Sequence, residues 1–292
     1  MTSLRERLTQ PETLVAPGIF DMISAKVAQD VGFDALYMTG YGVVASKVGL
    51  PDAGLATYSD MVERVGTISG GVDTPVICDG DTGYGGLLNV QHTVRGYERA
   101  GAAAIQIEDQ EFPKKCGHTP GRRVIAPEDM AAKIRVAHET RDSRDFLIIA
   151  RTDARTAYGL DEALRRAELY AKAGADLLFV ESPESIEEMQ IIASSFDLPL
   201  VANMVEGGST PILSAKELGE LGFSLAIFPA LGFLSAAATL RSAYRALAET
   251  GDSRSFDGEL YNFMEFSRLM GFEKVWEFER QQSDRPVGAV SE

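Results

Sequence analysis

Residues 75–109 read PVICDGDTGYGGLLNVQHTVRGYERAGAAAIQIED, and this stretch decides the fold. It begins with a short apolar run that ends at Asp79, and it continues with helical periodicity over Val90–Ala100. The chain then returns through Gly101 to a second apolar run that ends at Glu108. A strand, a helix and another strand in this order form a repeating unit of parallel sheet. Both strand runs end in acidic residues.

The same alternation recurs along the chain and predicts eight strands. They are expected at Thr13–Pro17, Ala35–Thr39, Pro75–Asp79, Ala104–Glu108, Phe146–Arg151, Leu177–Glu181, Leu200–Asn203 and Leu225–Phe228. Helices are expected at Val90–Ala100, Pro127–Thr140, Leu160–Ala173, Ser185–Ser194 and Ala215–Leu221. An open doubly wound sheet shares this alternation, but eight units without GxGxxG after the first strand favour a closed α/β fold, the (β/α)8 TIM barrel.

The 292 residues allow one large domain with an appendage. We expect a catalytic barrel domain over residues 1–250 and a C-terminal helical extension over residues 251–292. The extension contains two helical stretches rich in aromatic residues, Leu260–Met270 and Phe272–Arg280. Their apolar side chains need burial, either on the chain's own barrel or on a neighbouring subunit.

The charge of the chain excludes some partners. Lys and Arg total 28 against 43 Asp and Glu, which gives a formal net charge of −15. A nucleic acid backbone would be repelled over most of such a surface, so we expect no nucleic acid partner. No signal-like or membrane-spanning apolar run is present, which predicts no membrane association and a cytoplasmic protein.

Four carboxylates at two adjacent strand ends point to a metal. Asp79, Asp81, Glu108 and Asp109 should converge at the barrel mouth and would repel one another. Magnesium typically takes one or two protein carboxylates, several waters and oxygens of the substrate. The alternative is that some of these acids are paired with nearby cations, namely Arg151, Lys114 or Lys115.

The segment QEFPKKCGHTPGRRVI, residues 110–125, follows the fourth strand and predicts a mobile lid. Its cations suit closure over an anionic substrate, and they would lower the pKa of Cys116, which suits proton transfer. These cations are Lys114, Lys115, His118, Arg122 and Arg123. An ordinary solvated loop with a chance cysteine is the alternative.

Further side chains could bind carboxylates of a substrate. Arg151 in ARTDA offers a two-pronged hydrogen bond, although an ion pair with Asp153 or Glu181 is the competing interpretation. Asn203 and Thr210 in VANMVEGGSTP could complete the pocket.

The turn after the second strand offers backbone amides for another carboxylate, at Thr39, Gly40 and Tyr41, although turn formation alone would explain its glycines. Cys78 lies inside an apolar strand and is expected to be an inert core residue.

Taken together, these motifs resemble the isocitrate lyase and phosphoenolpyruvate mutase superfamily. The matching pieces run in family order from about residue 14 to about residue 240, and they are APGIFD, LYMTGYG, GLPDAGLATYSDM, CDGDTGYGG, IEDQ, KKCGH, ARTDA, FVES and NMVEGGSTP. The resemblance implies a (β/α)8 barrel whose C-terminal helices are swapped between subunits, commonly in a homotetramer.

The resemblance also implies roles for individual residues. The metal, Mg²⁺ or possibly Mn²⁺, would be held largely through waters by Asp79, Asp81 and Glu108, with Asp52 close by. Cys116 occupies the position of the catalytic cysteine of the lyases, and Glu181 resembles the acid that orients Arg151 or the substrate. The remaining catalytic or substrate-binding positions are Lys114, His118, Gly117, Thr39, Gly40, Tyr41, Arg151, Asn203 and Thr210.

The activity implied is cleavage of a carbon-carbon bond in a small 2-hydroxy or 2-oxo dicarboxylate. KKCGHTPGRR and NMVEGGSTP resemble dimethylmalate lyases, oxaloacetate hydrolases and the petal death protein more than methylisocitrate lyases. We therefore expect a lyase that releases a 2-oxo acid such as pyruvate from a 2-alkylmalate or 2-methylisocitrate. Oxaloacetate acetylhydrolase and oxaloacetate decarboxylase activities are alternatives, and a non-catalytic binding barrel is a remote one.

Overall fold

The computed structural model describes residues 3–117 and 121–283, so His118 lies outside the described residues. The chain divides into two compact units, Met1–Ala236 and Ala237–Glu292. The boundary lies within helix α11 (Leu231–Thr250), before the expected boundary at residue 250.

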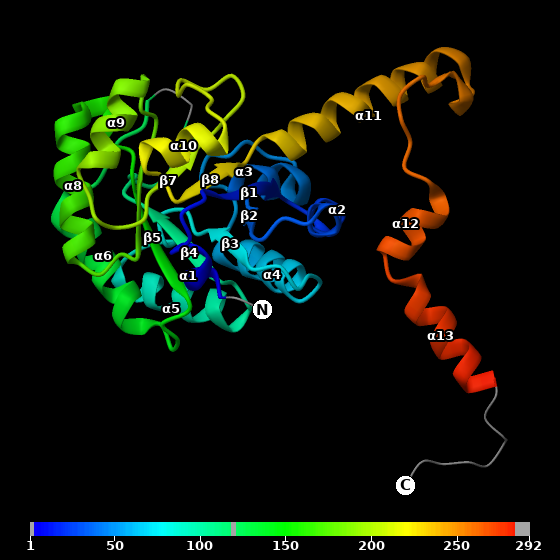
Figure 1. Cartoon of the computed structure of the whole chain (residues 1–292), viewed down its shortest axis with the longest axis horizontal. Helices are drawn as coiled ribbons and strands as arrows, with labels where there is room; N and C mark the ends of the chain where they lie inside the picture. Colours follow the sequence, from blue (N-terminus) through cyan, green and yellow to red (C-terminus); the bar gives the residue numbers. More distant parts are fainter. Residues whose placement is uncertain (1–2, 118–120, 284–292) are drawn as a thin grey trace, which may run out of the picture. The chain divides into compact units, whose positions relative to one another are not determined.

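The first unit is the predicted barrel. Eight parallel strands are ordered β6-β5-β4-β3-β2-β1-β8-β7, and a parallel bridge between Leu178 and Leu200 links the two end strands. The strands are β1 (Leu14–Ile19), β2 (Leu36–Met38), β3 (Val76–Asp79), β4 (Ala104–Glu108), β5 (Leu147–Thr152), β6 (Leu177–Val180), β7 (Val201–Asn203) and β8 (Leu225–Phe228). Figure 1 labels these strands apart from β6, and the (β/α)8 barrel fold is confirmed.

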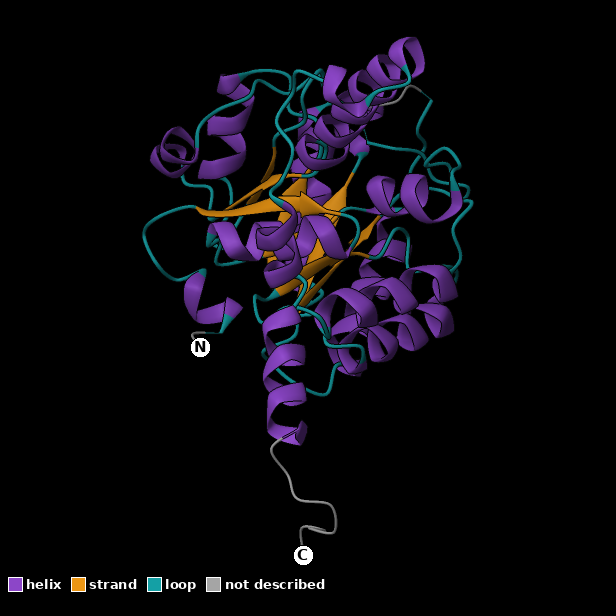
Figure 2. Ribbon diagram, turned by 90° about the vertical axis from the view of Figure 1, so that its right-hand side faces the viewer, coloured by secondary structure: helices purple, strands orange, loops and turns teal. Residues whose placement is uncertain are grey.

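Helices surround the strands, as Figure 2 shows. The longer ones are α2 (Met22–Val31), α4 (Tyr58–Ser69), α5 (Leu87–Arg99), α6 (Pro127–Thr140), α8 (Leu160–Lys172), α9 (Ile186–Ser194) and α10 (Ala215–Leu221). Short segments are α1 (Leu4–Arg7), α3 (Gly40–Val43), a π-helix (Val44–Val48) and α7 (Ala154–Tyr158). Local sequence sets many of their ends: α10 begins at a capping box between Ser214 and Glu217 and ends at Gly222, whose φ is 109°.

Two groups of buried side chains hold the barrel together. The larger one lies between the strands and the helices, and it includes Met61, Tyr97 and Ile134. The smaller one fills the barrel interior with residues such as Phe179, and it extends to Leu4 and Leu8 at the N-terminus. The interior is therefore a packed core and not a channel, which leaves the strand ends as the place for a site.

A buried network behind β4 and β5 fixes the barrel to helix α8. The carboxylate of Asp109 accepts hydrogen bonds from the Thr152 hydroxyl at 2.7 Å, the Tyr170 hydroxyl at 2.8 Å and the Asp153 amide at 2.9 Å. Arg166 of α8 lies 3.2 Å from the same carboxylate. Asp109 is fully buried, so these partners replace the water that its charge has lost.

The second unit contains the 3-10 turn Ser253–Ser255 and two helices, α12 (Phe263–Leu269) and α13 (Phe272–Ser283), close to the expected stretches. Several of its large apolar side chains are exposed; Phe263 is 80% and Phe278 is 61% exposed. Within the described ranges, no helix combines the length and apolar character needed to cross a membrane.

Candidate active site

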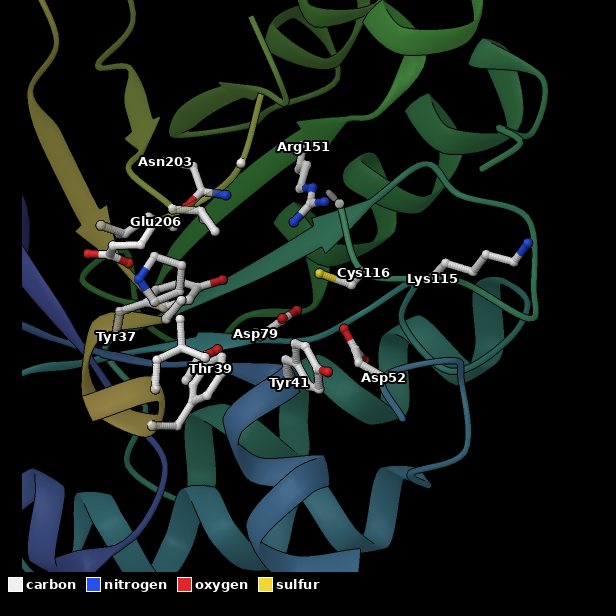
Figure 3. Close-up of a pocket in the computed structure, with 18 of the residues that line it drawn as sticks. Tyr37, Thr39, Tyr41, Asp52, Asp79, Lys115, Cys116, Arg151, Asn203 and Glu206 are labelled. Atoms are coloured by element: carbon white, nitrogen blue, oxygen red, sulfur yellow. The ribbon is translucent and has the colours of Figure 1, made fainter. Parts of the chain in front are cut away.

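A cavity of about 270 Å³ opens at the C-terminal ends of the barrel strands. Its charged side is lined by Asp52, Asp79, Glu108, Lys114 and Arg151, together with Cys116, Gly117 and Asn203. These residues come from strand ends and loops far apart in the sequence, and Figure 3 shows several of them around one space. The structure thus brings together most of the predicted site.

Asp79 is held by backbone amides on both sides. The Gly40 amide lies 3.3 Å from Oδ2, and the Asp81 amide donates to Oδ1 at 3.0 Å. A Cβ atom on Gly40 would lie 2.5 Å from Oδ2, so only glycine fits there without moving the carboxylate. The amide of Gly40 therefore faces the protein's own acid and not, as we expected, a substrate carboxylate. Gln106, which the sequence analysis did not single out, lies 3.5 Å from Oδ1 through its side-chain amide.

The ammonium group of Lys114 lies between two acids. Its Nζ is 2.5 Å from Asp52 Oδ1 and 2.7 Å from Asp81 Oδ1, and its side chain is 4% exposed. Burial opposes the charge, but the carboxylates of Asp81 and Asp52 outweigh it and hold the pKa of Lys114 well above its ordinary value. Burial also raises the pKa of Asp81 to about 6. Asp81 has a φ of 46°, a strained conformation that carries its side chain to Lys114.

Glu108 is a buried acid with spare acceptor capacity. Burial raises its pKa well above the ordinary value, and its Oε1 has no hydrogen-bond partner among the described residues. Lys114 alone cannot neutralise Asp52, Asp79 and Asp81, and the Arg151 guanidinium near Glu108 is shared with Asp153 and Glu181. The donor set therefore fits an added cation. Within the described residues, no three acidic, histidine or cysteine side chains converge closely enough to ligate one ion directly.

The guanidinium group of Arg151 is surrounded by the carboxylates of three acidic residues. Its Nε and Nη2 donate to the two oxygens of Asp153, each at 2.9 Å. Glu181 lies 3.3 Å from Nη2 and Glu108 lies 3.4 Å from Nε. The guanidinium also lies 5.1 Å from the ring centroid of Phe179. The alternative interpretation, in which Arg151 forms ion pairs within the protein, is thus correct. Arg151 also lines the cavity, where a substrate carboxylate would meet its guanidinium group.

Glu181 joins the arginine to the loop that carries Cys116. Asn203 Nδ2 lies 3.1 Å from Glu181 Oε2, and the Ser182 hydroxyl is 3.1 Å from both Glu181 Oε1 and the Gly117 carbonyl. A Cβ on Gly117 would lie 2.3 Å from Arg151 Nη2, so the loop packs directly on this cluster. Ser182 ends the FVES motif, but the sequence analysis assigned a role only to Glu181 in that motif.

The side chains of the loop cations take different directions in this structure, and closure of the loop over an anionic substrate stays a prediction. Lys115 extends away from the cavity in Figure 3, and its Nζ reaches the Gly121 carbonyl at 3.3 Å. Arg123 pairs with Glu111 at the surface. Arg122 is turned into the protein, away from solvent. Lys115 and Arg123 have partners within the loop, whereas the partners of Arg122 lie outside it, where the local sequence does not reveal them.

The two cysteines lie in different surroundings, as predicted. Cys116 is half-buried in the cavity wall, where its amide donates to the Asp52 carbonyl at 3.1 Å. Cys78 is fully buried in β3, and burial raises the pKa of its thiol, which keeps it protonated and unreactive.

Two further predicted residues lie elsewhere. Asp109 faces away from the cavity into the α8 network, so the expectation of a fourth clustered carboxylate is wrong. Thr210 is buried and is absent from the residues that line the cavity. Asp109 points away from the cavity because successive residues of a strand point to opposite faces, and its neighbour Glu108 points inward.

The other side of the cavity is apolar. Tyr41 and Phe233 form a tilted ring pair with centroids 5.3 Å apart. The same wall includes Val205, Ile227, Pro229, Ala230 and Leu234, with Thr39 beside it, and the carboxylate of Glu206 also lines the cavity. Of these, the sequence analysis singled out only Tyr41 and Thr39, since apolar residues without a motif give no functional signal.

Residues 4–248 match the family model described as phosphoenolpyruvate phosphomutase. The chain belongs to this family. It is 47% identical to 2,3-dimethylmalate lyase of Eubacterium barkeri over 94% of this chain and 96% of the relative. It is 43% identical to 2-methylisocitrate lyase of Aeropyrum pernix over 92% of this chain and 86% of the relative. Among solved structures, oxaloacetate acetylhydrolase with 3,3-difluorooxalacetate superposes with a TM-score of 0.91, at 32% identity over 97% of each chain.

The predicted membership of the phosphoenolpyruvate mutase and isocitrate lyase superfamily is therefore confirmed, and the chain is a carbon-carbon lyase of that superfamily.

Proposed function

We propose that this lyase cleaves a 2-alkylmalate, such as 2,3-dimethylmalate, to a 2-oxo acid and a carboxylic acid. The observation that carries the proposal is the two-sided cavity, with Arg151 and the acids on one wall and the Tyr41–Phe233 pair on the other. A charged wall suits the carboxylates of the substrate, and an apolar wall suits its alkyl groups. The likeness to 2,3-dimethylmalate lyase supports the same substrate class.

A third carboxylate would find few partners in this cavity. The cations among its described lining residues are Lys114, Lys115 and Arg151. Lys114 is already paired with Asp52 and Asp81, and the side chain of Lys115 extends outward. This distribution favours a dicarboxylate over 2-methylisocitrate.

We infer that a divalent cation, magnesium or manganese, is held by Asp79 with Asp52, Asp81 and Glu108, largely through water. The cation would polarise the 2-oxygen of the substrate and stabilise the carbonyl that forms there. The excess of buried carboxylates over ammonium groups, with the unpartnered oxygen of Glu108, supports this assignment.

The chain's own residues then divide the reaction between them. Arg151, oriented by Asp153 and Glu181, holds a carboxylate of the substrate. The 2-hydroxyl gives its proton to the acidic cluster, where burial raises the affinity of carboxylates for protons. The bond between C2 and C3 breaks, C2 becomes the carbonyl of the 2-oxo acid, and its bonding electrons stay on C3. Cys116 gives its thiol proton to C3, and the proton taken from the hydroxyl restores the thiol.

A second candidate activity is hydrolysis of oxaloacetate to oxalate and acetate. The likeness to oxaloacetate acetylhydrolase over 97% of each chain favours it. The apolar wall argues against it, because oxaloacetate carries no alkyl substituent to place there.

Purified protein with Mg²⁺ should release pyruvate fastest from 2,3-dimethylmalate and more slowly from 2-methylisocitrate, and it should release no oxalate from oxaloacetate. Mass spectrometry of the products separates the candidates, since the dimethylmalate reaction also gives propionate. Oxalate from oxaloacetate, without pyruvate from either hydroxy acid, would establish the hydrolase instead. No turnover of any of the three would point to a non-catalytic barrel.

Removal of divalent ions with EDTA should abolish activity, and Mg²⁺ or Mn²⁺ should restore it. Gly40→Ala should weaken Mn²⁺ binding, measured by electron paramagnetic resonance, because its Cβ displaces the Asp79 carboxylate. Gly86→Ala is the matched control, since its Cβ would meet no atom within 4 Å. Unchanged Mn²⁺ affinity in Gly40→Ala would place the ion away from Asp79.

Cys116→Ser should lower kcat by about 10²-fold or more while KM stays close to the wild-type value, because proton donation to C3 belongs to the transition state. Steady-state kinetics with 2,3-dimethylmalate measure both parameters. Cys78→Ser is the control for loss of a thiol. Equal kcat values for wild type and Cys116→Ser would refute the proton-donor role.

We also propose that the second unit packs on other copies of the chain, in a homotetramer with swapped helices. Its exposed aromatic side chains, such as Phe263 and Phe278, need a partner surface. Sedimentation of the full chain should give a tetramer that Phe263→Glu with Phe278→Glu dissociates, whereas Val31→Glu on α2 should leave it intact. A monomeric wild type would contradict the proposal.

A further inference from the structure

Arg122 leaves the loop and enters the protein beside the cavity. Its Nη1 donates to Asp153 Oδ1 at 2.6 Å, and its Nη2 donates to the Thr156 hydroxyl at 2.7 Å. Asp153 and Thr156 follow β5, the strand that ends in Arg151 and Thr152. The C-terminal arm of the loop is therefore attached to the strand end that carries the carboxylate-binding arginine.

The neighbouring Arg123 shows that this attachment is selective. The side chain of Arg122 is 5% exposed, whereas that of Arg123 is 76% exposed and pairs with Glu111 at the surface. A surface ion pair contributes little to stability, but a buried charge must have a partner. Two adjacent arginines of the same charge therefore differ in burial and partner.

Asp153 is the point where the two arginines meet. Its Oδ1 accepts hydrogen bonds from both Arg122 Nη1 and Arg151 Nη2, and its Oδ2 accepts one from Arg151 Nε. One negative charge is thus shared by two guanidinium groups. Burial opposes ionisation of Asp153, but Arg151 and Arg122 outweigh it and lower the pKa of its carboxyl.

Because Asp153 is shared by Arg122 and Arg151, less of the positive charge of Arg151 is neutralised within the protein, and more remains for a substrate. Arg151 also faces Glu181 and Glu108, at 3.3 and 3.4 Å. If Arg122 were neutral, Asp153 would be compensated by Arg151 alone, and the cavity would become more negative. A substrate carboxylate would then be attracted less strongly.

We propose that Arg122 is a positioning residue: it neutralises part of the negative charge of Asp153, so that Arg151 can bind a substrate carboxylate. The same contact fixes the loop arm to the end of β5. The inference rests on the proposed role of Arg151. It does not depend on which 2-hydroxy or 2-oxo acid is the natural substrate.

The test compares Arg122→Met with Arg123→Met in the full chain with Mg²⁺. Oxalate binding, followed by isothermal titration calorimetry, should weaken about tenfold in Arg122→Met, as expected for one charge-assisted contact, and stay near wild type in Arg123→Met. In Arg122→Met, KM for 2,3-dimethylmalate should rise as oxalate affinity falls, and the decrease in kcat should be smaller than the rise in KM. Equal oxalate affinities in the two variants would overturn the inference.

Three further variants separate charge from simple attachment. Arg122→Lys keeps the positive charge at Asp153 and should recover most of the oxalate affinity, whereas a residue that only anchors the loop would not be rescued. Thr156→Val removes the second contact and should change affinity little. In an Asp153→Asn background, Arg122→Met should add little; a full additional loss would contradict the shared-charge role. Should Asp153→Asn fail to fold, the lysine and valine variants still decide the question.

Failure of the Arg122 inference and failure of the proposed lyase function would give different results. Wild type that binds oxalate but cleaves no acid of the panel would remove the lyase assignment, while a selective effect of Arg122→Met on oxalate would still support the shared-charge role. Melting temperatures of all variants close to wild type would show that lost affinity is not lost folding.

Discussion

The buried guanidinium of Arg151 is the constraint on which the barrel mouth depends, because a charge removed from water must be surrounded by acceptors. Glu108, Asp153 and Glu181 supply those acceptors from the ends of β4, β5 and β6. One side chain therefore ties three adjacent strand ends together. Gly117 packs against the same guanidinium, so the segment that carries the cavity cysteine is placed by it as well.

Much of the barrel could be predicted from the sequence because its strands are short, apolar and sharply bounded. Strands β4 and β8 and helices α6 and α10 have the predicted bounds. Helix α5 begins three residues earlier than predicted, at Leu87. The reason is that Leu87 and Leu88 are exposed, so the buried periodicity on which the prediction depended starts only at Val90.

The site was predictable where it follows from strand geometry. Asp79 and Glu108 end their strands with inward-pointing side chains, whereas Asp109 is adjacent to Glu108 and must diverge from it. Asp81 lies beyond the end of β3, and its position depends on the turn. Applying this alternation would have excluded Asp109 from the acidic cluster. Loop side chains follow no such period. Arg122 turns inward because Asp153 and Thr156 are there to receive it, and those partners are brought near only by folding.

The apolar wall shows a different limit of sequence reasoning. Phe233 and Leu234 stand at the start of α11, in a stretch without a polar motif, yet they line the cavity opposite the charged residues. These two side chains contribute only to the shape of the cavity, and the sequence does not reveal that shape because it depends on the pairing of β8 with β1.

The carboxylate that two arginines share also has an evolutionary consequence. Residues 122 and 153 form one electrostatic unit with Arg151, so a change at one of them alters what the others experience. Selection could therefore adjust how strongly this barrel holds an acid by replacing a residue that never touches it. Sequences that diverge at position 122 should then diverge at position 153 as well, and a change in substrate preference could begin outside the cavity.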